Sequence, residues 1–202
     1  MTEPTRTRLE TIDPALLRAA GIGGLLGGAG LFLVMAGYYA ANNTGFWAIL
    51  NACFAAFVYK NAGMTPMMRG EAGMGHEMMG SQHIVASHIV VGTILHLAMS
   101  VTAGIAFAVV LAVLIRSGLH VLSTPVGYLL GSTAGGAILY LIMMEAVAPH
   151  LNRTIVDFTP RTPFVLAHLV FGAVVGGYVY WRCAAASRPV RSHAPRLRTR
   201  AV

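Results

Sequence analysis

SQHIVASHIVVGTILHLAMSVTAGIAFAVVLAVLI, residues 81–115, contains no aspartate, glutamate, lysine or arginine. A helix rises ~1.5 Å per residue, so about 20 residues cross the hydrocarbon core of a bilayer, and this stretch is long enough to do so. Three more charge-free runs cover residues 19–59, 117–144 and 162–181. None shows the two-residue alternation of a barrel strand, and a membrane-spanning segment must satisfy its own backbone hydrogen bonds. The sequence therefore predicts an all-α integral membrane protein.

The composition of the whole chain agrees with this class. Of the 202 residues, 56% are hydrophobic and 10% are charged, and the mean hydropathy is +0.67, which excludes an ordinary soluble domain. We expect four transmembrane helices, near residues 20–41, 90–115, 125–146 and 163–182. Residues 45–60 (GFWAILNACFAAFVYK) hold about 15 apolar residues, short for a span but long for a loop, and are expected to form an interfacial or re-entrant helix. If they cross the membrane instead, the number of spans becomes five and the amino terminus moves outside.

Basic residues predict which side of the membrane each end occupies. Three arginines lie in the first 18 residues and six in the last 21, and lysine and arginine concentrate on the cytoplasmic side. Both termini are therefore expected in the cytoplasm, with ten basic residues inside and four outside. This gives a cytoplasmic segment at 1–19, one helical membrane domain at 20–182 and a basic cytoplasmic tail at 183–202, in the plasma (inner) membrane of a bacterium. The tail is expected to rest on anionic lipid rather than on nucleic acid.

Small residues predict how the helices pack. Lipid tails are as apolar as leucine, so helices associate where small side chains let the backbones approach. Glycines recur with a four-residue spacing, which stacks them on one helix face; the pairs are Gly23 and Gly27, Gly24 and Gly28, Gly131 and Gly135, and Gly172 and Gly176. In addition, HLAMSVTAG from His96 and HLVFGAVVG from His168 share the pattern His-Leu-x-x-small-x-x-x-Gly. This repeat indicates a duplicated helical hairpin.

The two histidine motifs also carry a resemblance to known proteins. The runs ILHLAMSVTAG (94–104) and FVLAHLVFGAVVGGYVY (164–180) resemble small uncharacterised bacterial four-helix membrane proteins with His-Leu-x-x-Gly helix motifs. The resemblance covers the last three predicted spans. It implies a four-helix bundle and no particular activity.

Ionisable side chains at membrane depth are costly and therefore point to function. Glu145 and His150 lie at the outer end of the third predicted span, and His96 and His168 approach the same level from the second and fourth. Glu145 and the three imidazoles are expected to converge below the loop that carries Asp157, a ligand set that suits zinc or copper. Alternatively, each histidine hydrogen-bonds a neighbouring helix and Glu145 sits in interfacial water. Haem held between His96 and His168 also stays open.

GMTPMMRGEAGMGHEMMGSQH, residues 63–83, contains six methionines and two histidines, and we call it the Met/His segment. It is expected on the outer side of the membrane. Soft thioethers prefer Cu(I) and imidazole accepts either oxidation state of copper, so the segment predicts a copper site. The expected ligands are Met74, His76, Met78 and Met79, with Met64, Met67, Met68 and His83 as a second cluster. The alternative is that methionine serves here as a flexible packing residue against lipid or a partner.

No motif predicts an enzyme that acts alone. The sequence lacks a phosphate-binding glycine loop, a dinucleotide fingerprint and a nucleophile elbow. We expect a non-catalytic accessory subunit that binds other integral membrane subunits, in a metal-dependent oxidase, respiratory or copper monooxygenase complex. The alternatives are a copper-handling protein that stores or delivers the ion, and a structural protein without a ligand.

Overall fold

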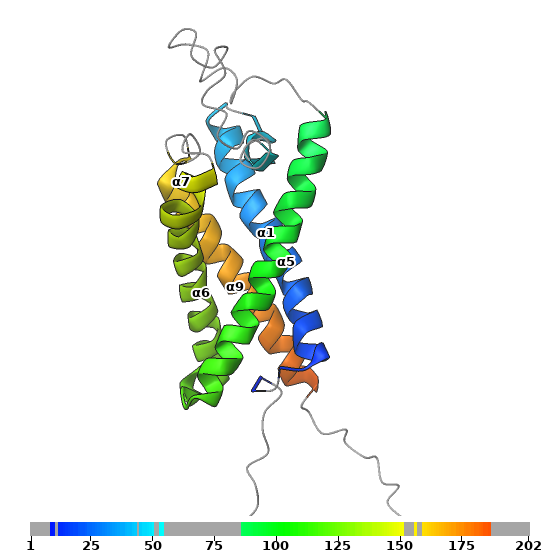
Figure 1. Ribbon diagram of the computed structural model, residues 1–202, viewed down its shortest axis with the longest axis vertical. Coiled ribbons are helices and arrows are strands. Elements are labelled where there is room, and N and C mark those ends of the chain that lie inside the picture. The colour runs from blue at the N-terminus through cyan, green and yellow to red at the C-terminus, as the bar shows by residue number, and fades with distance from the viewer. Residues whose placement is uncertain are drawn as a thin grey trace, which may run out of the picture.

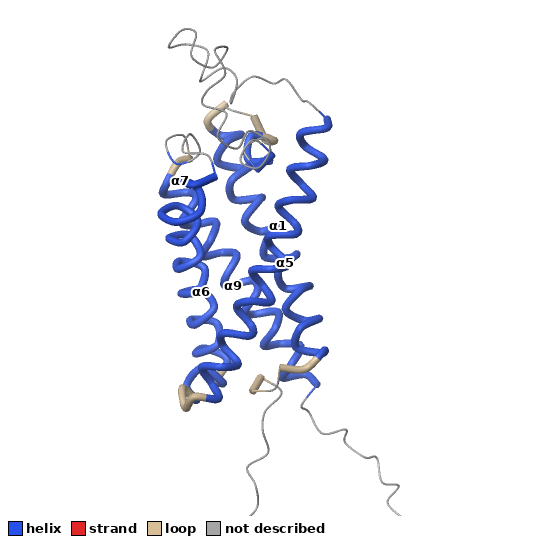
Figure 2. Tube along the Cα trace, in the orientation of Figure 1, coloured by secondary structure: helices blue, strands red, loops and turns tan. Residues whose placement is uncertain are grey.

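The structure is a computed structural model that describes residues 9–10, 12–43, 45–50, 53–54, 86–151, 156 and 159–186. Every regular element within these residues is helical (Figure 1). The elements are α1 (Pro14–Ala41), α5 (Ala86–Arg116), the 3-10 helix η1 (His120–Ser123), α6 (Pro125–Leu141), the π-helix η2 (Ile142–Val147), α7 (Ala148–Leu151) and α9 (Arg161–Ala186). Figure 2 shows that α6, η2 and α7 continue one another, and we call them together the α6–α7 rod.

Within the part of the chain that the structure describes, four helices are long and apolar enough to cross a membrane: Pro14–Ala41, Ala86–Arg116, Pro125–Leu151 and Arg161–Ala184. The predicted all-helical class and the number of long apolar helices are therefore confirmed. α1 begins earlier than expected because Asp13 caps it, its side-chain oxygen accepting from the Leu16 N–H at 2.7 Å. Pro14 suits the first helical position, where an N–H would have no partner within the helix.

The short stretch after α1 is also helical in part. Residues 48–50 and 53–54 adopt helical turns. The Leu50 carbonyl oxygen occupies the space that a side chain at Gly92 would need, so this stretch lies directly against α5. The interfacial or re-entrant placement of 45–60 stays a prediction, since residues 51–52 and 55–60 lie outside the described residues.

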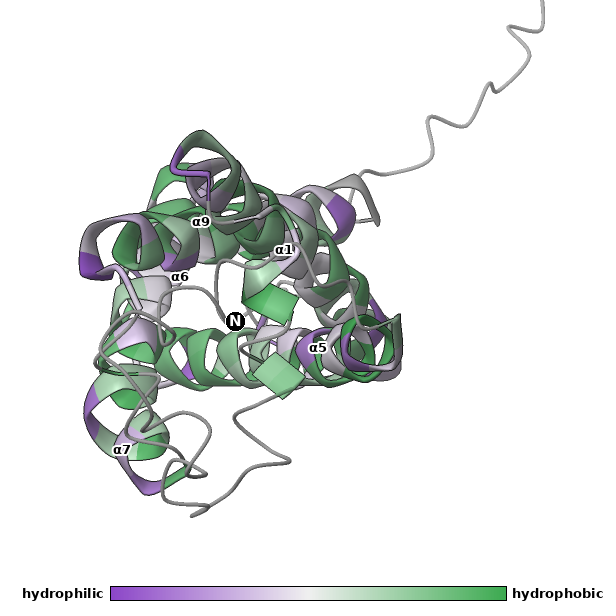
Figure 3. Ribbon diagram, turned by 90° about the horizontal axis from the view of Figure 1, so that it is seen from above, coloured by the Kyte–Doolittle hydropathy of each residue, from purple (hydrophilic) through white to green (hydrophobic). Residues whose placement is uncertain are grey.

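The long helices follow the order α5, α1, α9 and α6 around the bundle (Figure 3). α1 packs closely on both α5 and α9, and α9 packs closely on α6, whereas α5 and α6 meet at few positions. The ring of helices is therefore loosest between α5 and α6. In Figure 1 we call the end that holds α7 the upper end, and the end that holds η1 the lower end.

Small residues bring α1 and α5 into backbone contact. A side chain at Gly24 would overlap the Ser100 carbonyl oxygen, and one at Gly28 would overlap the Ser100 hydroxyl. A Cβ atom at Gly104 would lie 2.6 Å from the Ala20 carbonyl oxygen. One face of α5 therefore approaches α1 so closely that larger side chains do not fit.

The contact between α6 and α9 repeats this arrangement. A side chain at Gly136 would overlap the carbonyl oxygen of His168. Side chains at Gly172 and Gly176 would both overlap Ser132. Each of the two repeated histidine motifs therefore lies on the face that its helix turns toward its hairpin partner.

The predicted pair Gly131 and Gly135 does not make such a contact. Gly135 lies against the ring of Phe107, whose nearest atom would be 3.4 Å from an added Cβ, and Gly131 likewise adjoins side chains only. α6 approaches α9 through Ser132 and Gly136 instead, one position further along the chain.

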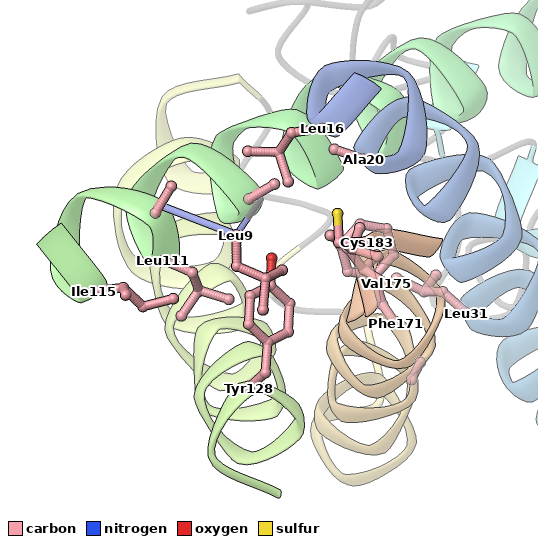
Figure 4. Close-up of a cluster of buried hydrophobic side chains, with 14 of the residues drawn as sticks. Leu9, Leu16, Ala20, Leu31, Leu111, Ile115, Tyr128, Phe171, Val175 and Cys183 are labelled. Carbon is pink, nitrogen blue, oxygen red and sulfur yellow. The ribbon is translucent and has the colours of Figure 1, made fainter. Parts of the chain in front are cut away.

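Buried apolar side chains form one cluster that runs through the bundle (Figure 4). Leu16 of α1, Tyr128 of α6, and Val175 and Cys183 of α9 are all buried in this cluster. Much of the interior is therefore a packed core. A hollow of about 290 Å³ lies at the lower end, beside Asp13, Arg18 and Arg182, and a second, lined by histidines, lies nearer the upper end.

Candidate functional site

A cavity of about 140 Å³ lies in the upper half of the bundle. Met99 and Ala103 line it from α5, and Leu139 and Met143 line it from the α6–α7 rod, so it occupies the region where these helices separate. Most of the lining is apolar. Its polar and thiol side chains are Cys53, His96, Ser100, Thr159 and His168. We call it the histidine cavity.

His96 is held by two hydrogen bonds at the contact between α1 and α5. Its Nε2 atom lies 2.9 Å from the carbonyl oxygen of Gly28, and its own carbonyl oxygen accepts from the Ser100 hydroxyl at 2.7 Å. A carbonyl oxygen can only accept, so Nε2 carries the proton. The side chain is 9% exposed.

His168 is held in the opposite way. Its Nδ1 atom lies 2.8 Å from the carbonyl oxygen of Phe164, one turn earlier in α9, so Nδ1 carries the proton. The imidazole meets the Phe164 ring edge to face at 4.3 Å between centroids and the Tyr140 ring at 5.9 Å. Only 3% of the residue is exposed, so the ring is fixed in position and orientation.

Each imidazole therefore keeps one ring nitrogen free of a proton: Nδ1 in His96 and Nε2 in His168. No aspartate or glutamate is among the described residues that line the cavity, and an unpaired charge at this depth is costly, which favours the neutral form of an imidazole there. A neutral ring nitrogen either accepts a hydrogen bond or binds a metal ion.

The structure brings together two of the predicted site residues, His96 and His168. Glu145 and His150 are exposed and are not part of the cavity lining. Within the described residues, no group of three or more His, Cys, Asp or Glu side chains could hold a metal ion. The other predicted ligands and their neighbours lie outside the described residues; these are Met64, Met67, Met68, Met74, His76, Met78, Met79, His83 and Asp157.

The sequence did not predict the π-helical turn at Ile142–Val147, which carries Met143 into the cavity lining. The Ala148 N–H bonds to the Met143 carbonyl oxygen, five residues back rather than four. Pro149 follows directly; a proline lacks the N–H and clashes with normal α-helical spacing, which accounts for the wider turn. This proline was the one signal in the sequence that marked the turn.

No protein-family model, curated protein or solved structure matches this chain. Function must therefore be inferred from the side chains at the site, because a helical bundle alone does not define an activity.

Proposed function

We propose that this chain is a non-catalytic accessory subunit of a bacterial membrane protein complex, in a metal-dependent oxidase, respiratory or copper monooxygenase assembly. Its partners are other integral membrane subunits. In this role the bundle contributes packing surfaces and a bound small molecule or ion, while the chemistry belongs to the partner chains.

Uneven burial of the long helices supports this proposal. Half of the most apolar part of α1 is buried (50%), but only 17% of the corresponding part of Pro125–Leu151 is buried. On its outer side the α6–α7 rod exposes Leu130 and Ile138, at 63% and 56%. Between them lies Ala134, also exposed, and a small residue between larger ones lets a neighbouring membrane helix approach.

Purification from the native membrane in mild detergent tests the proposal. We expect a constant set of membrane subunits to co-purify, identified by mass spectrometry. Ala134→Trp should reduce their recovery, because a bulky ring on the exposed face of α6 prevents close helix packing. Leu33→Trp is the matched control, since Leu33 is 62% exposed on α1. A lone monomer from wild-type membranes would contradict the proposal.

A copper-handling protein, which stores or delivers the ion, is the second candidate. The composition of the cavity lining favours it, since Met99 and Met143 supply thioethers beside His96 and His168. Thioether and imidazole together suit Cu(I). In this function the Met/His segment would take up the ion.

Copper content separates the two candidates. If the chain handles copper, protein purified from native membrane should hold nearly stoichiometric copper. A variant in which four residues of the Met/His segment are changed to alanine should lose it; these are Met74, His76, Met78 and Met79. His120→Ala, a change at the lower end of the bundle, is the control and should keep its copper. Unchanged copper content and unchanged copper tolerance of cells carrying the fourfold variant would exclude copper handling by the segment.

A further inference from the structure

We propose that the histidine cavity binds the head group of a membrane hydroquinone: an aromatic ring with two hydroxyl groups, whose apolar tail remains in the lipid. This inference goes beyond the proposed function and does not depend on which subunits are partners. It rests on the size of the cavity, on the fixed tautomers of its two histidines, and on the separation of α5 from α6.

The size of the cavity favours an organic ring over a bare ion. Its volume of about 140 Å³ is close to that of an apolar protein cavity of ~150 Å³ that takes up benzene. A metal ion, by contrast, needs several ligand atoms within roughly 2.0–2.3 Å. Such a site would have to contract around the ion, whereas a single ring fills the space as it stands.

Three of the five polar and thiol groups in the lining, His96, Ser100 and His168, favour a partner that donates hydrogen bonds, whereas Cys53 and Thr159 can also donate. The Nε2 atom of His168 is at the tip of the ring, and the Nδ1–H is already committed to the Phe164 carbonyl oxygen. His96 likewise has its Nε2–H committed to Gly28, and the Ser100 proton is committed to the His96 carbonyl oxygen. The ring nitrogens of His96 and His168 that carry no proton, and the oxygen of Ser100, can therefore still accept a hydrogen bond.

A hydroquinone satisfies these acceptors. One ring hydroxyl donates to Nε2 of His168, and the second donates to the pair formed by His96 and Ser100. An acyl chain or an oxidised quinone fills the same volume but has no hydroxyl proton to offer. Buried acceptors would then stay unpaired, which is unfavourable.

The tail reaches the bilayer between α5 and α6. These helices pack loosely, and the side chains that line the cavity on either side are Met99 and Ala103 on one helix and Met143 on the other. Methionine side chains are flexible and adapt to irregular shapes, so they can move apart around an isoprenoid chain. Met143 lies on the π-helical turn, a feature that is frequent at functional sites.

Calorimetric titration of the full chain in detergent tests the proposal with three probes of equal length: decylbenzohydroquinone, kept reduced under argon, decylbenzoquinone and decylbenzene. We expect one hydroquinone per chain, bound at least tenfold more tightly than either of the others. His168→Phe keeps an aromatic ring between Phe164 and Tyr140 but removes the acceptor, so the tenfold preference should disappear. His150→Phe is the control, because His150 is exposed and outside the cavity lining.

A second variant distinguishes loss of the binding site from loss of folding. Ala103→Phe fills the cavity while both histidines stay, and should abolish binding of all three probes with the helical circular dichroism unchanged. Equal affinity for the three probes, or a preference that survives in His168→Phe, would overturn the proposal. Stoichiometric binding of Cu(I) alone that is lost in His168→Phe, without any preference for the hydroquinone, would also overturn it and assign the cavity to a metal. Recovery of partner subunits is measured separately, so either proposal can fail without the other.

Discussion

At the scale of single residues, the Ser132 side chain occupies the space that any side chain at Gly176 would need. Its hydroxyl is directed back to its own helix, donating to the Leu129 carbonyl oxygen at 3.0 Å. The contact between α6 and α9 is therefore a fit between one small polar side chain and one missing side chain. Close packing of this kind stabilises helix pairs in a bilayer, where the hydrophobic effect between helices is absent.

Gly176→Ala should lower the free energy of unfolding by about 1–3 kcal/mol, the usual effect of overpacking a tight contact. Gly177→Ala is a control at the next position, because nothing lies within 4 Å of a Cβ atom there. It should leave stability unchanged or raise it by up to ~1 kcal/mol through helix propensity. Titration with sodium dodecyl sulfate, followed by circular dichroism, measures both.

The double variant Gly176→Ala with Ser132→Gly should recover most of the loss, since it moves the side chain from one helix to the other. In double-mutant cycles, residues in direct contact show interaction energies of about 0.5–3 kcal/mol. Additive effects of the two changes would mean that the helices are further apart than the structure shows.

Residue spacing predicted part of this contact. Gly172 and Gly176 lie at a helix interface, as their spacing indicated. On α6, however, small residues surround the helix, so spacing alone could not show whether Gly131 or Ser132 faces the neighbour. That choice depends on the rotation of the whole helix in the bundle, which no local pattern determines.

At the scale of elements, the bundle consists of two helical hairpins, α1 with α5 and α6 with α9, joined mainly through α1 and α9. In the first hairpin, Gly28 meets Ser100 and His96; in the second, Gly136 meets His168. The duplication indicated by the two histidine motifs is thus matched by equivalent contacts. The hydrogen bonds differ, because His96 bonds across to α1 and His168 bonds within its own helix.

Two fragments, residues 1–118 and 119–202, should associate when they are expressed together, because each contains one hairpin. The break follows Gly118, which has a φ of +106° in the turn after α5. Recovery of one fragment through an affinity tag on the other measures the association. Gly27→Leu should prevent it, since a Cβ atom there would lie 3.0 Å from the Phe171 carbonyl oxygen of α9.

Gly37→Leu is the control for the split chain, because nothing lies within 4 Å of a Cβ atom at that position. It should leave recovery unchanged. If the tagged fragment is recovered without the other unaltered fragment, the division of the bundle into two hairpins that associate is wrong.

Element boundaries were predicted less well than element number. Charge-free runs marked the four long helices because the cost of a charge in the bilayer is large. The start of α1 instead depends on the Asp13 cap, and the α6–α7 rod continues past Pro149 by changing to π-helical spacing. Both are local hydrogen-bond effects that a hydropathy pattern does not register.

At the scale of the whole molecule, the distribution of basic residues predicts the orientation. Reporter fusions after residue 118 and at both termini should report the cytoplasm, and a fusion after residue 61 should report the outside. The reason is the excess of lysine and arginine at the termini. An amino terminus found outside would instead show that residues 45–60 cross the membrane.

The histidine cavity was only partly predictable. Its two histidines were expected at a common level, but Met99 and Met143 were not expected beside them. They line the cavity because α5 and α6 separate in the upper half of the bundle. Such a separation results from all the helix contacts together, so it has no signature in any single stretch.

The central position of α1 has a consequence for biogenesis. α1 ends at Ala41, yet α5 begins only at Ala86 and α9 at Arg161. With synthesis at roughly 5–20 residues per second, the first helix waits for seconds before either neighbour leaves the ribosome. Its two glycine faces meet lipid or the insertion machinery during that time. Synthesis of the last helix is thus the step that closes the bundle, and a ribosome that stalls before residue 161 leaves the first helix with one face uncovered.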